Sequence, residues 1–343
     1  MTAGVLLRND GPLGHITLNR PKALNALTHD MCRSIYEALQ GWVADPAIHA
    51  VLIDAVPGRA FCAGGDIRSI YHLGRTDLPA AEAFFSTEYR LNAAIRHFPK
   101  PYIALLNGIT MGGGAGLSVH GSHRLVTENT SFAMPETGIG LYPDVGGTYF
   151  LSRLQGQTGT CLALTGMRIG PADMVWLGLA THYVSSAKLE GVAIRLTEGE
   201  PVEAVLAALA EPPPTAPGMA PLSARIDDAF RGDSVEEIIA NLQHAGDWGR
   251  DIGKALATHS PTSLKLTLRG LREARKLDFE GCMRMEYRMT LRVLRGHDLY
   301  EGVRAILIDR DQHPRWNPDL LEKVTSQQID RYFASLADKE LAL

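Results

Sequence analysis

The chain has 343 residues, of which 45% are hydrophobic and 21% charged, and its formal net charge is −4. This composition is typical of a globular protein with a packed core and argues against intrinsic disorder. The slightly acidic balance disfavours a nucleic-acid-binding protein, which needs a clustered surplus of basic residues.

The cysteines and the N-terminal residues exclude several further classes. Cys32, Cys62, Cys161 and Cys282 show neither zinc-type nor redox-type spacing. The first residues lack the pattern of a secretory signal peptide, and no apolar stretch approaches the ~20 residues of a membrane span. We therefore expect a cytoplasmic protein with no bound metal and with neither a membrane nor a nucleic acid as its partner.

The first part of the chain alternates predicted strands and helices. Two alternating apolar runs separated by Asp10-Gly11 predict a β-hairpin. Strands are expected near residues 5–7, 15–19, 51–53, 102–106 and 124–126, and helices from Thr28, over 80–97 and over 112–117. This alternation is typical of parallel βαβ units.

The predicted strands stop near residue 185. Helices are expected over 187–210, 223–256, 262–276, 279–295 and 317–337, with a proline-rich linker near 211–221. The sequence thus predicts an α/β core over residues 1–186 and a helical C-terminal region over 187–343.

Three glycine-rich segments combine backbone freedom with candidate chemistry: FCAGGDI (61–67), NGITMGGG (107–114) and MPETGIGLYPDVGG (134–147). The first two are each expected between a strand and a helix, where glycine lets backbone N–H groups approach a ligand. Two such turns side by side can direct two donors at one oxyanion. The third segment supplies carboxylates. Each segment alone is more simply explained as a chain reversal, and only the three together favour a functional site.

Together with RPKALNAL (20–27), these motifs resemble the enoyl-CoA hydratase/isomerase, or crotonase, superfamily. The resemblance extends through FFSTEYRLNAAI (84–95), SPTSLK (260–265) and HDLYEGVRAILIDRDQHPRW (297–316), so it covers nearly the whole chain. It implies an α/β fold, a crotonase-like spiral of ββα units with a C-terminal helical region. Because such helices are often involved in trimer contacts in the family, a homo-oligomer is expected.

The resemblance also implies a CoA thioester as the substrate. The family holds the thioester carbonyl between two backbone amides, which fall here on Gly65 and Gly113. The CoA moiety is expected along a set of loop residues: Lys22, Ala23, Ala63, Asp66 and Ile67. From the sequence alone, Lys22 is either a partner of a CoA phosphate or a solvated loop lysine.

The acidic residues separate the possible reactions. Hydratases of the superfamily use two glutamates, of which Glu136 matches the second, whereas Gly116 stands at the position of the first. Within the superfamily the chain most resembles 3-hydroxyisobutyryl-CoA hydrolases, which share this pattern and add an acid at Asp144. Glu88 matches a substrate-contacting glutamate of this subgroup and is expected to bind the acyl 3-hydroxyl; a surface helix acid is the alternative.

The expected function is hydrolysis of a short branched 3-hydroxyacyl-CoA, as in valine degradation, with no cofactor beyond the CoA of the substrate. Glu136 either attacks the thioester carbon or activates a water, and Asp144 orients that water or assists proton transfer. Two other functions remain open: hydration or isomerisation of another CoA ester, and non-catalytic binding of CoA esters.

Overall fold

The computed structural model describes residues 4–343, and their contacts define two compact units, each assembled from three stretches of chain. The first unit comprises the stretch ending at Asp66, then Thr87–Phe132 and Arg168–Ala220. The second comprises Ile67–Ser86, Ala133–Met167 and Pro221–Leu343. These units interleave along the sequence, and a domain boundary at residue 186 stays a prediction.

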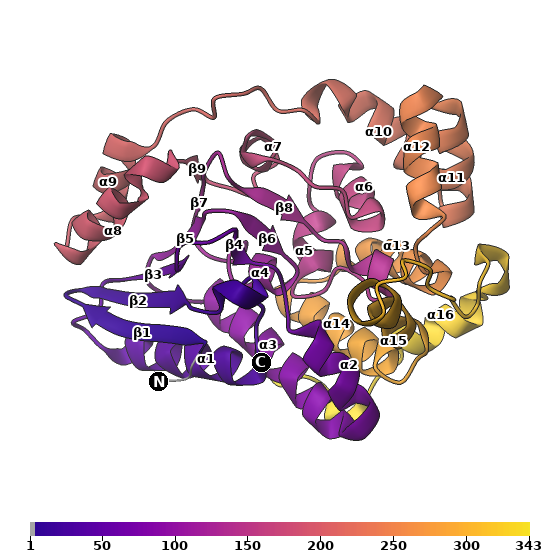
Figure 1. Cartoon of the computed structure of the whole chain (residues 1–343), viewed down its shortest axis with the longest axis horizontal. Coiled ribbons are helices and arrows are strands. Elements are labelled where there is room, and N and C mark those ends of the chain that lie inside the picture. The colour runs from indigo at the N-terminus through magenta and orange to yellow at the C-terminus, as the bar shows by residue number, and fades with distance from the viewer. Residues whose placement is uncertain (1–3) are drawn as a thin grey trace. The chain divides into compact units, whose positions relative to one another are not determined.

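A six-stranded sheet with the strand order β1-β2-β3-β5-β7-β9 forms the centre of the first unit (Figure 1). Its strands are β1 (Val5–Asp10), β2 (Leu13–Leu18), β3 (Ala50–Ala55), β5 (Tyr102–Leu106), β7 (His123–Val126) and β9 (His182–Tyr183). The β1–β2 pair is antiparallel, and every other pair is parallel. The predicted hairpin and the predicted parallel strands are confirmed.

Helices cover the sheet because its strands are apolar on both faces. One face buries residues such as Leu52, Ile103 and Leu125 against α8 (Leu189–Thr197) and α9 (Val202–Leu209). Helix α1 (His29–Ala44) packs beside β1 and begins where the Thr28 side chain accepts a hydrogen bond from the Met31 N–H.

A second, three-stranded sheet has the order β4 (Ala60–Cys62), β6 (Ile109–Met111) and β8 (Ser131–Ala133). Each of these strands follows a strand of the large sheet after a short turn, so that β3–β4, β5–β6 and β7–β8 contribute one strand to each sheet. A helical segment follows each pair: α2 (Ile67–Thr76), α4 (Gly113–Gly116) and the 3₁₀ turn η2 (Glu136–Ile139). This repetition is the expected spiral of ββα units.

The second unit is helical. Its remaining α-helices are α5 (Gly147–Leu151), α6 (Thr158–Thr165), α10 (Ser223–Phe230), α11 (Val235–His244), α12 (Gly246–Leu256), α13 (Pro261–Ala274), α14 (Phe279–Val293), α15 (Asp298–Val303) and α16 (Ser326–Phe333). Helix α13 packs against α5 and α6, and α14 packs against α5 and α16. In the part of the chain that is described, no helix has both the length and the apolar character needed to cross a membrane.

Three of the predicted helices differ from the structure. The helix expected over 187–210 is interrupted between α8 and α9, where Gly199 has a φ of +85° and Pro201 follows. The helix expected over 223–256 forms three helices. Only α16 and a short 3₁₀ turn fall within 317–337. Glycine or proline interrupts the first two helices although the apolar pattern continues on both sides. In the third, α16 begins only after Thr325, whose side chain accepts a hydrogen bond from the Gln328 N–H.

Candidate active site

The RPKALNAL loop and the FCAGGDI segment pair through their backbones in the first unit. The Leu27 N–H donates to the Gly64 carbonyl at 2.9 Å, and the Asp66 N–H donates to the Leu27 carbonyl at 2.8 Å. The loop turns through left-handed backbone at Leu24 and Asn25, and the buried Asn25 amide donates to the Ala60 carbonyl at 2.9 Å. Two motifs that are far apart in sequence therefore form one local structure.

The amides of Gly65 and Gly113 lie beside each other in this unit. A Cβ placed on Gly113 would lie 3.3 Å from the Gly65 nitrogen, and one placed on Gly64 would lie 3.7 Å from the Gly113 nitrogen. Gly64 has a φ of +111°, which favours glycine. Within residues 4–343, neither the Gly65 N–H nor the Gly113 N–H donates a hydrogen bond to the protein. Neither amide is therefore committed to an acceptor within the described chain.

Glu88 lies at the same place, on α3 (Leu78–Arg96). Its carboxylate Oε1 is 2.5 Å from the position that a Cβ on Gly113 would occupy, and the residue is only 2% exposed. The surface-acid alternative is therefore wrong. A buried carboxylate beside two backbone donors is a suitable acceptor for a substrate hydroxyl.

The residues expected along the CoA moiety have different environments. Lys22 and Ala23 are exposed in the 3₁₀ turn η1 (Pro21–Ala23), and Ala63 is half-buried. Asp66 is half-buried and forms an ion pair with Arg20 at 3.1 Å. Ile67 opens α2 and belongs to the second unit.

Glu136 and Asp144, the predicted catalytic acids, both belong to the second unit. Glu136 begins η2, is 6% exposed, and accepts a hydrogen bond from the Leu141 N–H at its carbonyl, at 3.0 Å. The next side chain, Thr137, donates to the Leu164 carbonyl at 3.0 Å and contacts His259 Nδ1 at 2.9 Å. Helix α6 and the segment before α13 thus hold the turn that carries Glu136.

Asp144 lies on the loop that leads into α5 and is 4% exposed. Its carbonyl accepts from the Gly147 N–H at 2.7 Å. The two residues that follow are left-handed, with φ of +52° at Val145 and +82° at Gly146. The chain therefore turns sharply directly after Asp144, before α5 begins.

Cys62, within the FCAGGDI segment, is poorly suited to act as a nucleophile. Cys62 is fully buried, and burial raises the pKa of its thiol to about 12, so the thiolate is scarce at neutral pH. Across residues 4–343, no three His, Cys, Asp or Glu side chains gather closely enough to hold a metal ion.

Two buried polar residues escaped the sequence-based prediction. Glu286 on α14 binds the loop after Asp144, and its position in an amphipathic C-terminal helix offers no motif that would reveal this. Asn92 lies one helical turn after Glu88 on α3, is 0% exposed, and neither atom of its amide has a protein partner within the described chain. The sequence signal that could have identified Asn92 is a polar residue at a core-facing helical position.

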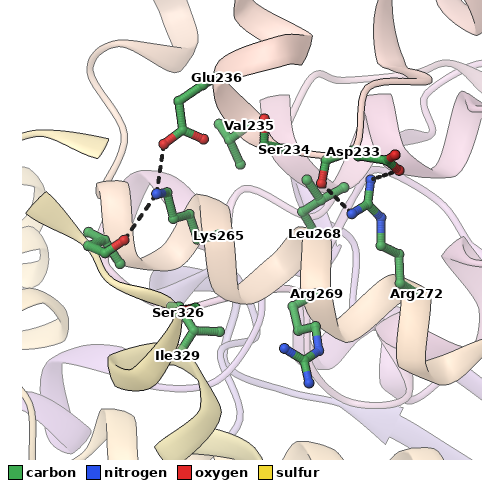
Figure 2. A pocket seen from close by; sticks show the side chains of 11 residues that line it. Asp233, Ser234, Val235, Glu236, Lys265, Leu268, Arg269, Arg272, Ser326 and Ile329 are labelled. Atoms are coloured by element: carbon green, nitrogen blue, oxygen red, sulfur yellow. Dashed lines mark hydrogen bonds and ion pairs between the residues drawn. The ribbon is translucent and has the colours of Figure 1, made fainter. Parts of the chain in front are cut away.

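The pocket drawn in Figure 2 lies elsewhere in the second unit, between α11, α13 and α16. It has a volume of about 250 Å³ and contains none of the predicted site residues. Its basic side chains are already paired: Lys265 contacts Glu236 at 2.7 Å, and Arg272 contacts Asp233.

The fold and the motifs define the class of protein. A model of the enoyl-CoA hydratase/isomerase family matches residues 13–333, and the chain belongs to this family. Among curated relatives, a mitochondrial 3-hydroxyisobutyryl-CoA hydrolase of Xenopus tropicalis is 48% identical over 98% of this chain and 90% of the relative. The Homo sapiens protein of the same name is 46% identical, with the same shares of the two chains covered.

Two solved structures are similar over the whole chain. A carnitinyl-CoA dehydratase from Mycobacterium thermoresistibile is 43% identical with a TM-score of 0.94, covering 99% of this chain and 98% of that one. An enoyl-CoA hydratase from Rhodobacter sphaeroides 2.4.1 is 40% identical with a TM-score of 0.92, covering 99% and 100%.

One expectation is wrong by these comparisons. The sequence led us to expect a cytoplasmic protein, whereas the curated relatives from frog, fish, bird and mammals are named mitochondrial. The expectation relied on the missing secretory pattern and on unpaired cysteines, which are shared by reducing compartments in general and do not distinguish among them.

Proposed function

We propose that this protein hydrolyses 3-hydroxyisobutyryl-CoA to 3-hydroxyisobutyrate and CoA, a reaction of valine degradation. The carrying observation is the pair of unpartnered amides of Gly65 and Gly113 beside the buried carboxylate of Glu88. Two fixed donors suit the oxygen of a thioester carbonyl as it becomes an oxyanion, and Glu88 suits the 3-hydroxyl of the acyl group. The names of the full-length relatives support the same reaction.

The proposed reaction uses the chain's own carboxylates and needs no resident cofactor. In one route the Glu136 carboxylate attacks the thioester carbon, the C–S bond breaks, and CoA leaves as a thiolate that takes up a proton. Water then hydrolyses the resulting mixed anhydride and restores Glu136. In the other route Glu136 removes a proton from a water that attacks the same carbon directly. Asp144 orients the water in either route.

The CoA moiety is proposed to follow the paired RPKALNAL and FCAGGDI segments. Lys22 and Ala23 are exposed and accessible at η1, and Lys22 supplies a cation for a CoA phosphate. Ala63, Asp66 and Ile67 would flank the part of the CoA moiety that leads to the thioester.

A homo-oligomer also stays a prediction that sedimentation can test.

Hydration of an enoyl-CoA is the second candidate, because the two similar solved structures carry the titles of a dehydratase and a hydratase. The residues of this chain argue against it. Gly116, at the position of the first hydratase glutamate, is buried on α4 and supplies no carboxylate. Glu136 therefore has no second carboxylate at position 116 to act with it in adding water.

The test compares CoA release from 3-hydroxyisobutyryl-CoA by the wild type, Glu136→Gln and Asp144→Asn. Glu37→Gln on the exposed face of α1 is the matched control. We expect Glu136→Gln to lose at least ~100-fold in kcat and the control to match the wild type. Unchanged turnover in Glu136→Gln would contradict the proposed role of Glu136. A wild type that binds the thioester but releases no CoA would contradict the proposed reaction and favour a non-catalytic CoA-ester-binding protein.

A single turnover in ¹⁸O-labelled water tests the anhydride route. If Glu136 attacks the substrate and the anhydride is hydrolysed at the Glu136 carbonyl, one labelled oxygen remains in Glu136, which direct attack by water cannot produce. Label in the product acid alone excludes hydrolysis of an anhydride at the Glu136 carbonyl.

A further inference from the structure

Helix α14 binds the loop that carries Asp144 through a single buried carboxylate. Glu286 Oε2 accepts a hydrogen bond from the Gly146 N–H at 2.7 Å. Its Oε1 accepts from the Thr148 N–H at 2.9 Å and from the Thr148 hydroxyl at 2.6 Å. One donor from the loop and two from the first turn of α5 therefore converge on one side chain that is 0% exposed.

The same helix also holds the loop on the other side of Asp144. The hydroxyl of Tyr142 donates to the Glu286 main-chain carbonyl and lies 2.7 Å from the Thr290 Oγ1. Asp144 thus lies between two points of attachment, Tyr142 before it and Gly146 after it, and both attach to α14.

The loop needs such attachment because its backbone is strained. Val145 is β-branched and has a φ of +52°, a region that β-branched residues avoid. Gly146 continues the left-handed turn with a φ of +82°. Conformations of this kind persist only where surrounding contacts impose them, and the Glu286 side chain supplies three such contacts.

Burying the Glu286 carboxyl at this position costs free energy. Burial raises the pKa of Glu286 to about 8, and the hydrogen bonds from Thr148 and Gly146 only partly oppose that rise. An apolar residue would fill the same volume without this cost, but it would leave the N–H groups of Gly146 and Thr148 buried without acceptors.

We infer that Glu286 is a positioning residue for the proposed reaction, acting through the loop it binds to set the orientation of the Asp144 carboxylate. This inference depends on the role proposed above for Asp144. Misplacement of a reacting group by about 1 Å costs on the order of 100-fold in rate, so the loss of the attachment has a measurable effect.

The principal variant is Glu286→Gln, which keeps the shape of the side chain but places an amide NH₂ against one of the loop donors. We expect kcat for CoA release to fall ~10- to 100-fold, with KM within about 3-fold of the wild type. Glu280→Gln, near the start of the same helix, is the matched control and is expected to leave kcat unchanged. If Glu286→Gln fails to fold, Thr148→Val removes one of the three donors and is expected to give a smaller loss of kcat.

A double-mutant cycle distinguishes positioning from a merely structural role. If Glu286 acts through Asp144, adding Glu286→Gln (or Thr148→Val) to Asp144→Asn lowers kcat no further. If the losses multiply in full, or if Glu286→Gln alone keeps wild-type kcat, the inference is overturned while the proposed function stands. If Asp144→Asn itself keeps wild-type kcat, the proposed role of Asp144 fails, and the inference fails with it.

Discussion

The Gly65 nitrogen lies 3.3 Å from the position that a Cβ on Gly113 would occupy, so a side chain at position 113 would crowd the Gly65 amide. These residues come from segments almost fifty positions apart, brought together by the parallel pairing of β4 with β6. The local excess of glycine in the sequence has a structural reason at this point. Here the backbone itself is the proposed binding group.

Gly113→Ala is expected to abolish most activity without unfolding the protein. The new methyl would meet Glu88 Oε1 at 2.5 Å and the Leu27 side chain at 3.1 Å, and would fill the space beside the Gly65 amide. The methyl group would block access to the Gly65 amide. Because removing one oxyanion donor typically costs ~3 kcal/mol, we expect kcat/KM to fall at least ~100-fold. Gly41→Ala, on α1 with open space around it, is the control and is expected to retain activity. If Gly113→Ala and Gly41→Ala were equally active, the Gly65–Gly113 pair would have no role in the mechanism.

Glu88→Gln is expected to change selectivity more than it changes the chemical step. A site built to bind a substrate hydroxyl rejects an analogue that lacks it, because its own polar group is then left unpaired. We expect the preference for 3-hydroxyisobutyryl-CoA over isobutyryl-CoA, measured as the ratio of kcat/KM values, to fall at least ~10-fold. An unchanged ratio would show that Glu88 does not contact the 3-hydroxyl.

Cys62→Ala is expected to keep the rate of CoA release within about 3-fold of the wild type. The thiol is buried, and its pKa is raised to about 12, so it supplies neither a nucleophile nor a base. A modest decrease in melting temperature is expected, because the change removes a buried sulfur atom. Loss of turnover with the fold intact would mean that the FCAGGDI turn needs Cys62 chemically.

The sequence predicts the large sheet and the glycine turns well because these depend on local patterns. Buried runs such as residues 51–53 and 102–106 identify parallel strands, and Asn107-Gly108 identifies the turn that follows. The three-residue strands β4, β6 and β8 are too short to produce a periodic signal, so the second sheet was missed. Its existence depends on the larger sheet placing the three segments side by side.

The sequence predicts the candidate site residues that belong to a motif. It does not predict those that tertiary packing brings to the site. Glu136 and Asp144 stand inside a recognisable segment, and their burial agrees with a functional role. Glu286 lies 142 positions after Asp144 in an ordinary helical pattern, and only the fold brings it to the Asp144 loop. Long-range contacts of this kind leave no trace in spacing or composition.

The pKa of Glu286 predicts a dependence of stability on pH. Its folded-state pKa of about 8 lies above the ordinary value of 4.5, because burial disfavours the charge and Asp144 adds repulsion. The folded protein therefore holds this proton more tightly than the unfolded chain. The resulting stabilisation is fully present below about 4.5 and is lost as the pH rises through about 8.

Glu286→Gln lacks this titratable group. The free energy of unfolding of the wild type is therefore expected to fall, relative to that of the variant, as the pH rises from about 4.5 to about 8. Chemical denaturation at a series of pH values measures the difference. A difference that stays constant with pH would show that Glu286 titrates normally and that its burial has no electrostatic consequence.

The most direct test of the hydrolase assignment offers the purified protein 3-hydroxyisobutyryl-CoA and crotonyl-CoA together. Free thiol reports hydrolysis, and loss of the enoyl chromophore reports hydration. We expect kcat/KM for CoA release from 3-hydroxyisobutyryl-CoA to exceed that for hydration of crotonyl-CoA by at least ~100-fold, and Gly113→Ala to abolish the release. Rapid hydration with little free CoA would contradict the account and assign the fold to a hydratase.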